Sequence, residues 1–236
     1  KNLNVKIFEA NIDTLAVQGP KSFKLMEDIF GNSITKLKFF KFDFFKFKNN
    51  KFLISRSGYS KQGGYEIHIN DTKAGLELYD HFFDIGKKYN VKPGAPNQAE
   101  RIEGGLLSYG NDMLISDNPF ECGFEKLVNL NSNIEFLGKN SLKKIWNKGI
   151  NRKLMGVKIN SNKIDLNSLS ANQNYYLINN KEELIGDLRS AAYSPTFKKI
   201  VGIAMIKKAY FEEKKDFYTN TNNKWVEGEI CNLPIS

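Results

Sequence analysis

The sequence predicts an α+β protein: an antiparallel sheet with helices, followed by a small β-barrel or sandwich. Residues 39–86 have the pattern of a β-hairpin, a further strand and then a helix. From Lys153 onward, short apolar segments alternate with turns rich in Asn and Ser, which is typical of an all-β domain. Because this change occurs near residues 147–152, we place one domain at 1–148 and a second at 149–236.

Composition narrows the classes of protein to consider. The chain has 236 residues and a net charge of +9, from 35 Lys and Arg against 26 Asp and Glu. Only four of these cations are arginines and the lysines are spread along the chain, so we expect no nucleic-acid partner but a field that can attract a small anionic ligand. No apolar run approaches the roughly 20 residues that span a bilayer, and no signal peptide is visible. We therefore expect no membrane partner and a cytoplasmic location.

Cysteine and histidine are too few for a metal-binding or disulfide framework. Cys122 and Cys231 are the two cysteines, and His68 and His81 are the two histidines. Two cysteines cannot build a cysteine-rich zinc site. We expect buried, reduced thiols and no metal.

The start of the chain predicts two strands and a helix. Residues 3–8 alternate in polarity as a strand does, and residues 15–20 form a second short apolar strand. Pro20 suits the first turn of a helix and Gly31 its end. The predicted buried face of this helix consists of Phe23, Met26, Ile29 and Phe30.

Residues 39–47 are dense in phenylalanine and predict a buried strand. Phe40, Phe42 and Phe44 would point to one side, and Phe45 and Phe47 to the other, so we expect a bulge or a strand buried on both faces. Asn49-Asn50 would form a hairpin turn, with residues 51–56 as the returning strand. We interpret the whole aromatic stripe as core and not as a stacking platform for bases.

The next strand places two polar side chains on one face. Alternation over residues 65–69 puts Glu66 and His68 together, with Tyr65 on the opposite face. Residues 70–72 can cap a helix whose buried positions are Ala74, Leu78, Phe82 and Ile85.

Two further helices and five strands are predicted downstream. Asn97 is a suitable N-cap for a helix that buries Ala99, Ile102 and Leu106 and leaves Arg101 off the stripe, available to a ligand or an ion pair. A second helix at 138–146 would turn Leu142, Ile145 and Trp146 inward. The predicted strands of the β-domain are 154–159, 175–179, 184–192, 200–206 and 225–231.

The residues alone leave the chemistry open. No nucleophile elbow, Walker loop, zinc-protease motif or dinucleotide fingerprint is present. A buried Glu66 could accept two hydrogen bonds from an amino-pyrimidine edge, and Arg101 could hold a carboxylate. The alternatives are a solvent-facing carboxylate for Glu66 and an ion pair with Glu100 or Glu103 for Arg101.

Five motifs follow one another along the chain. They are LAVQGP at 15–20, SRSGYSKQGGYEI at 55–67, RIEGGLLSYGND at 101–112, FLGK at 136–139, and RSAAYSP at 189–195 with GIAMI at 202–206. In order and spacing these motifs resemble those of the glycine-cleavage T-proteins, the aminomethyltransferases. The resemblance covers nearly the whole chain and implies a folate-binding region, here without its N-terminal part, and a C-terminal barrel.

One departure from the T-protein pattern points to a branch of that family. T-proteins carry R-D-x-L-R where this chain has PNQAER at 96–101, so only Arg101 remains. This form resembles the dimethylsulfoniopropionate (DMSP) demethylases, which move a sulfonium methyl group to tetrahydrofolate and yield methylmercaptopropionate and 5-methyltetrahydrofolate. The tRNA-linked folate-binding relatives are disfavoured, because their K-G-C-x-x-G-Q motif is absent.

The resemblance also implies roles for individual residues. Glu66 would hold the N–H edge of the pterin ring, with Arg101 and Tyr65 as further folate contacts. Tyr59 and His68 would lie near the substrate, where an aromatic face attracts a sulfonium. The catalytic residue is not assigned, because the family's acidic residue lies ahead of Leu3, in a segment that this sequence does not include.

Two other functions remain open at this point. One is another folate-dependent aminomethyltransferase or N-demethylase, and the other is a folate-binding or nucleic-acid-binding module without turnover. A homodimer is among the assemblies that the resemblance leaves open.

Overall fold

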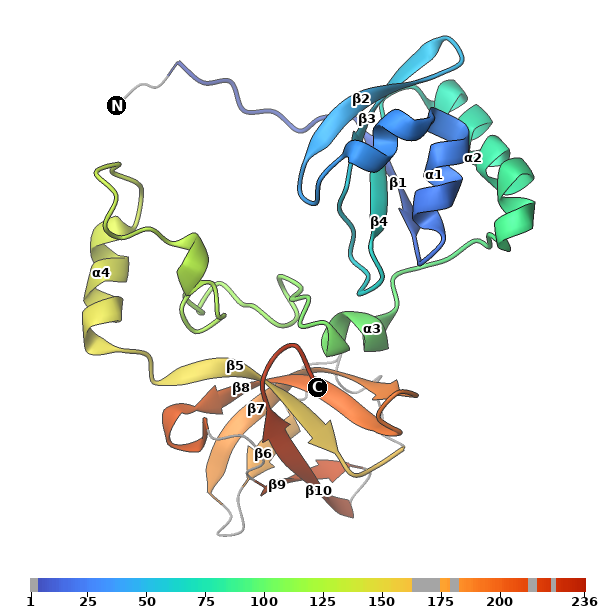
Figure 1. The fold of residues 1–236 in the computed structure, drawn as a ribbon. Coiled ribbons are helices and arrows are strands. Elements are labelled where there is room, and N and C mark those ends of the chain that lie inside the picture. Colours follow the sequence, from blue (N-terminus) through green and yellow to red (C-terminus); the bar gives the residue numbers. More distant parts are fainter. Residues whose placement is uncertain (1–3, 163–174, 179–182, 212–215, 222–223) are drawn as a thin grey trace. The chain divides into compact units, whose positions relative to one another are not determined.

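The computed structural model describes residues 4–162, 175–178, 183–211, 216–221 and 224–236, and it divides the chain into two compact units, 1–96 and 97–236 (Figure 1). Residues 4–12 form neither helix nor strand. The predicted strand at 3–8 is therefore wrong over its described residues. Val5, Ile7 and Phe8 are mostly exposed, and alternation alone does not make a strand where no partner strand pairs with it.

The first unit is a four-stranded antiparallel sheet with two helices on one face (Figure 1). The spatial order of the strands is β1-β4-β3-β2, so β1 and β2 form the edges. The elements are β1 (Asp13–Gln18), α1 (Ser22–Phe30), β2 (Phe42–Phe47), β3 (Asn50–Ser55), β4 (Gly64–Ile69) and α2 (Thr72–Gly86), with short 3-10 turns at Asn32–Lys36 and Lys87–Tyr89.

The helix boundaries follow from local chemistry. Gly31 ends α1 with a φ of 80°, a backbone conformation that favours glycine. Asp71 caps α2, because its side chain accepts a hydrogen bond from the Ala74 amide at 3.1 Å. Both ends agree with the sequence-based prediction.

The phenylalanine-rich segment divides between core and surface. Phe45 and Phe47 are buried under α1 and α2, whereas Phe42 and Phe44 are 66% and 53% exposed. The prediction that the whole stripe is core is therefore wrong. Because side chains alternate along a strand and the helices cover only one face, every second phenylalanine lies on the other face. The hairpin turn lies at Lys48 and Asn49, one residue earlier than predicted.

The second unit contains a closed six-stranded barrel preceded by short helices. The helical elements are α3 (Gln98–Glu103), a 3-10 turn at Glu125–Leu127 and α4 (Lys139–Lys148). The barrel order is β10-β5-β8-β7-β6-β9, closed by pairing of β9 with β10. Its strands are β5 (Arg152–Ile159), β6 (Tyr175–Ile178), β7 (Leu184–Ser194), β8 (Lys199–Lys207), β9 (Asp216–Thr221) and β10 (Lys224–Cys231).

The barrel interior is filled by apolar side chains, and one strand of it was not predicted. Val157, Ala204 and Ile230 are fully buried in one core cluster of this unit. The strand missed by sequence is β9, whose Phe217 is also fully buried. A side chain at Gly228 would meet the Phe217 ring at 2.4 Å, so only glycine allows that ring to lie against β10. The predicted α+β fold with a C-terminal barrel is confirmed.

The second predicted amphipathic helix is present, and Leu142 and Ile145 are half-buried on its predicted inner face. Trp146 is 56% exposed in α4, so its predicted inward position is wrong. The side chain that α4 buries is Lys139, whose ammonium donates to the carbonyl oxygens of Ser132 and Ile134. A lysine can take that place because its charge is satisfied by local oxygens. Among the described residues, no helix has the length and apolar character needed to cross a membrane.

Candidate functional site

The polar residues of the predicted site gather on the face of the first unit's sheet that lies opposite α1 and α2. We call this the helix-free face and define it by Ala16, Phe42, Ser55, Glu66 and His68. Strand register places Ala16 beside Glu66, Glu66 beside Ser55, and Ser55 beside Phe42. Directly paired residues in antiparallel strands point to the same side, so these side chains form one row across four strands.

A chain of hydrogen bonds connects the two predicted ligands of this face. Ser57 Oγ donates to Glu66 Oε2, and Ser55 Oγ lies 2.7 Å from Ser57 Oγ. Ser55 Oγ also lies 3.4 Å from His68 Nε2. Glu66 and His68 are therefore brought together, as the alternation of β4 predicts.

Glu66 keeps capacity for a further partner. The residue is only partly buried, and its Oε1 atom accepts no hydrogen bond from the described residues. A carboxylate oxygen with unused lone pairs, held in place through its other oxygen, suits an N–H donor of a bound ring. This arrangement fits the amino-pyrimidine edge of a pterin.

The glycine-rich turn between β3 and β4 is fixed to β1 by Gln18. Its Nε2 donates to the carbonyl oxygens of Ser57 and Tyr65 at 3.1 and 3.2 Å, and its Oε1 accepts from Ser60 at 2.7 Å. A Cβ at Gly58 would lie 2.1 Å from Gln18 Oε1, and one at Gly64 2.2 Å from the Val17 carbonyl oxygen. Gly58 leaves room for the Gln18 side chain, and Gly64 leaves room for the Val17 carbonyl oxygen.

The two tyrosines of the predicted site differ in environment. Tyr65 is fully buried on the helix side of β4, with its ring 5.5 Å from that of Phe23. Burial raises the pKa of its phenol. Since Glu66 points to the other face, a contact of Tyr65 with folate would have to come through its backbone. Tyr59 lies in the glycine-rich turn and is 37% exposed.

Arg101 belongs to the second unit and forms an ion pair in its interior. Its Nη1 donates to Asp112 Oδ2 at 2.6 Å and to the Leu106 carbonyl oxygen, and its Nη2 donates to Ser190 Oγ at 2.9 Å. The guanidinium is almost completely buried, although the sequence suggested a side chain off the buried stripe. Of the two roles considered for it, the structure contains the ion pair, and its partner is Asp112 on the following loop.

A second charged cluster in this unit surrounds Cys122. Arg152 donates from Nε to Glu121 at 3.0 Å and from Nη2 to Asp117 at 2.9 Å. Burial, followed by the nearby negative charges of Asp117 and Glu121, raises the pKa of the Cys122 thiol to about 11. Cys122 and Cys231 are both buried thiols, as predicted. The described residues contain no cluster of three or more His, Cys, Asp or Glu arranged to hold a metal ion.

Comparison with known families matches both parts of the chain. The family model described as "GCVT N-terminal domain" matches residues 1–132, and that described as "Glycine cleavage T-protein C-terminal barrel domain" matches residues 152–235. This chain belongs to the glycine cleavage T-protein family.

Curated relatives and a solved structure agree with this assignment. The dimethylsulfoniopropionate demethylase of Ruegeria pomeroyi is 33% identical over 211 residues, which is 89% of this chain and 56% of that protein. The aminomethyltransferase of Thermoanaerobacter pseudethanolicus is 33% identical over 202 residues, 84% of this chain and 52% of that protein. The glycine cleavage aminomethyltransferase T of Bartonella henselae shares the fold, with a TM-score of 0.81 at 23% identity, over 95% of this chain and 60% of that one. The chain thus spans about half the length of these curated relatives.

Sequence reasoning gave no role to three residues of the site. Ser55, Ser57 and Gln18 stand inside the recognised motifs, but their contacts depend on strand register and on the path of the glycine-rich turn. One signal was available. Ser55 ends the strand that returns from the hairpin, so pairing of that strand with the next would bring it close to Glu66.

Proposed function

We propose that this chain is part of a tetrahydrofolate-dependent methyltransferase that demethylates DMSP. The S–CH3 bond of the sulfonium breaks with its electron pair going to sulfur, which leaves the thioether methylmercaptopropionate. Folate N5 forms the new bond to the methyl carbon and loses its proton, giving 5-methyltetrahydrofolate. A sulfonium is already an activated methyl donor, so the protein has to orient the two reactants and exclude water.

The observation that carries this proposal is the likeness to the Ruegeria pomeroyi demethylase over 89% of the chain. The sequence ahead of Arg101 supports it. Where T-proteins carry an additional arginine, this chain has Asn97, which caps α3 by accepting hydrogen bonds from the amides of Ala99 and Glu100.

On the helix-free face we propose Glu66 as the folate ligand and His68, with Tyr59, as substrate contacts. Ser57 would orient the Glu66 carboxylate by holding its Oε2, which leaves Oε1 for the pterin. Arg101 is retained as a proposed folate residue on the resemblance, and its guanidinium is held by the ion pair with Asp112.

The proposal also includes a domain boundary at 148/149 and a cytoplasmic location. It includes no metal and no nucleic-acid partner, and a homodimer is the assembly to test.

The second candidate is an aminomethyltransferase of the glycine cleavage type. It is favoured by the equal identity, 33%, of the Thermoanaerobacter pseudethanolicus protein. Such an enzyme would take its one-carbon group from an aminomethyl carrier and would not need a sulfonium.

A substrate comparison tests the proposal. The full-length protein is incubated with tetrahydrofolate and DMSP, dimethylglycine, sarcosine or an aminomethyl-lipoyl carrier protein, and folate products are separated by chromatography. We expect 5-methyltetrahydrofolate with DMSP alone. Product only with the amines or the carrier would establish the second candidate, and folate binding without any product would identify a binding module.

A further inference from the structure

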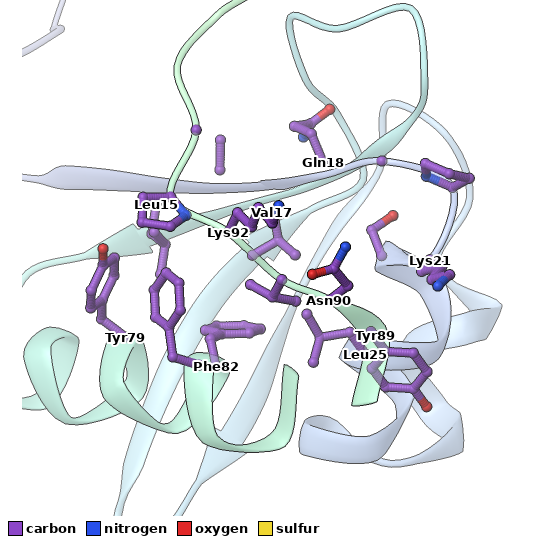
Figure 2. A pocket seen from close by; sticks show the side chains of 18 residues that line it. Leu15, Val17, Gln18, Lys21, Leu25, Tyr79, Phe82, Tyr89, Asn90 and Lys92 are labelled. Carbon is purple, nitrogen blue, oxygen red and sulfur yellow. The ribbon is translucent and has the colours of Figure 1, made fainter. Parts of the chain in front are cut away.

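A cavity of about 470 Å³ lies in the first unit, on the helix side of the sheet at the edge formed by β1 (Figure 2). Leu15 and Val17 reach it from β1, Leu25 from α1, and Tyr79 and Phe82 from α2. Residues 89–94, which follow α2, form its remaining wall. Its volume is in the range of sites for small organic ligands.

The wall formed by residues 89–94 is held in place by packing and by polar contacts. A Cβ at Gly86 would lie 2.6 Å from Val91 Cγ2, so glycine at this position allows Val91 to pack directly on the end of α2. Tyr89 Oη donates to Asp28 Oδ2 at 2.7 Å, and the Lys88 ammonium lies 2.7 Å from the same oxygen. Two elements of the cavity, α1 and the segment after α2, are therefore joined at the Asp28 carboxylate.

The larger part of the cavity lining is apolar. Leu25 and Phe82 are buried, and Leu15, Val17 and Val91 pack partly against the core. A ligand that fills this space therefore needs a hydrocarbon or aromatic body, because a polar body would lose its hydrogen bonds to water without replacement.

The polar groups of the lining favour an anion. Lys21 and Lys92 both contribute to it, neither ammonium forms an ion pair with a described residue, and no acidic residue is among those that line the cavity. Helix α1 begins here without a side-chain cap, and its first turn has no acidic residue, so its positive end is not neutralised. Each of these features attracts negative charge.

One buried side chain lacks a partner at this place. Ser22 is 4% exposed and lines the cavity, and its Oγ has no hydrogen-bond partner in the described structure. A buried hydroxyl without a partner is unfavourable, and an oxygen of a bound anion can accept its proton. The two lysines and the start of α1 make an anionic head group the best match, and a carboxylate is the simplest such group.

We propose that this cavity is a binding site for a small amphipathic carboxylate, with its apolar body between Leu15, Val17, Leu25 and Phe82 and its carboxylate near Lys21, Lys92 and Ser22. The cavity lies on the helix side of the sheet, because Val17 pairs with Tyr65, which points to that side, whereas Glu66 points away. It shares with the helix-free face only the edge residue Ala16. It does not depend on the proposed folate chemistry.

Octanoate is the probe, with octylammonium and octanol as matched compounds of opposite and no charge. The protein is labelled at its methyl groups, and each compound is titrated below its micelle concentration at low ionic strength. We expect octanoate to shift the methyl resonances of Leu15, Val17, Leu25 and Val91 with saturation, octanol to bind more weakly, and octylammonium to bind least.

Variants distinguish binding at this cavity from nonspecific hydrophobic binding of the probe elsewhere on the protein. Lys21→Gln with Lys92→Gln should weaken octanoate about three- to ten-fold and leave octanol unchanged, because two partly solvated ion pairs are lost. Lys24→Gln, on α1 but outside the cavity, and Glu66→Ala, on the other face, should leave octanoate affinity unchanged. Absence of saturable shifts, equal binding of octylammonium, or an unchanged affinity of the double variant would each overturn the proposal.

Discussion

The two units differ in whether their key polar side chains keep unused hydrogen-bonding capacity. In the first unit, helices cover one face of an open sheet, and the other face carries a partly buried carboxylate with an unused oxygen. In the second unit, the barrel is closed, and the guanidinium groups of Arg101 and Arg152 are paired with carboxylates of the same unit. Arg101, Asp112 and Ser190 form one such closed group.

We propose from this difference that the ligand contacts lie in the first unit and that the buried ion pair of Arg101 in the second unit serves stability. A carboxylate that retains acceptor capacity can exchange water for a ligand, whereas a buried ion pair has no capacity left and exists at the expense of desolvation. If this comparison holds, changes in the second unit should reduce stability, and changes on the helix-free face should reduce ligand binding.

The largest expected effect is loss of the buried charge at Asp112. Asp112→Ala should lower the free energy of unfolding by about 3–5 kcal/mol, because Arg101 would remain buried without its partner. Urea denaturation followed by tryptophan fluorescence measures this, since Trp146 and Trp225 both lie in the second unit. Asp112→Asn, which retains a hydrogen-bonding group, should cost less. A loss below about 1 kcal/mol for the alanine variant would show that the pair is dispensable.

Within the first unit, the two faces should respond differently to the same substitution. Phe45→Ala should cost about 3–5 kcal/mol, because Phe45 is 7% exposed and packs against Phe30. Phe42→Ala, three positions earlier in the same strand and 66% exposed, should change stability by no more than about 0.5 kcal/mol. Circular dichroism during thermal unfolding of both variants is sufficient. Equal losses would mean that the helix-free face is itself part of a core.

A smaller and selective effect is expected at Glu66. In the full-length protein, Glu66→Ala should weaken tetrahydrofolate binding by about 1–3 kcal/mol with little change in stability, because a ligand hydrogen bond is lost and not a core contact. Isothermal titration calorimetry gives the Kd, and Glu66→Gln serves as the control of equal shape. Ser57→Ala should weaken binding less, since it only frees Glu66 Oε2. An unchanged Kd for tetrahydrofolate in Glu66→Ala would show that Glu66 does not contact the folate.

The smallest expected effect is a pH dependence from Cys122. Its pKa in the folded protein, about 11, lies above the reference value of 9.0, so the folded state holds the thiol proton more tightly. The stability that the protonated Cys122 thiol adds to the folded state is fully present below about pH 9, and it is lost as the pH rises from about 9 to 11. The difference in urea midpoint between wild type and Cys122→Ala should therefore be constant at lower pH and change only in that window. A difference that changed below pH 8 would contradict the assignment.

Much of the fold was predictable because the decisive signals are local. Asp71 and Asn97 cap their helices, Gly31 ends one, and alternation in β4 separates Tyr65 from Glu66. The predictions that were wrong concern residues whose pairing or burial depends on which other elements pack beside them. Residues 4–8 alternate without a partner strand, and the phenylalanines of β2 divide between faces according to where the helices lie. Trp146 is exposed although Leu142 and Ile145 of the same helix are half-buried.

The sequence predicted which residues belong to the candidate site, but it did not predict their hydrogen-bond and ion-pair partners. Glu66 and His68 share a face by period alone, and the motif at 55–67 marks the glycine-rich turn. The partner of Arg101 could not be read from spacing, because Asp112 approaches it through a loop with several turns. The cavity beside β1 was also missed, since it depends on how Val91 packs on Gly86.

The place of Gln18 between two glycines has a consequence for how sequences of this family can vary. A larger residue at position 64 would collide with the Val17 carbonyl oxygen, and one at position 58 would displace the Gln18 side chain and break its hydrogen bonds. A shorter residue at 18 would remove the bond to Ser60 and the restraint on position 58 together, whereas position 64 would still be limited by the Val17 carbonyl and by its φ of 153°. Among relatives, positions 18 and 58 should therefore be inherited as a pair, with 64 fixed independently.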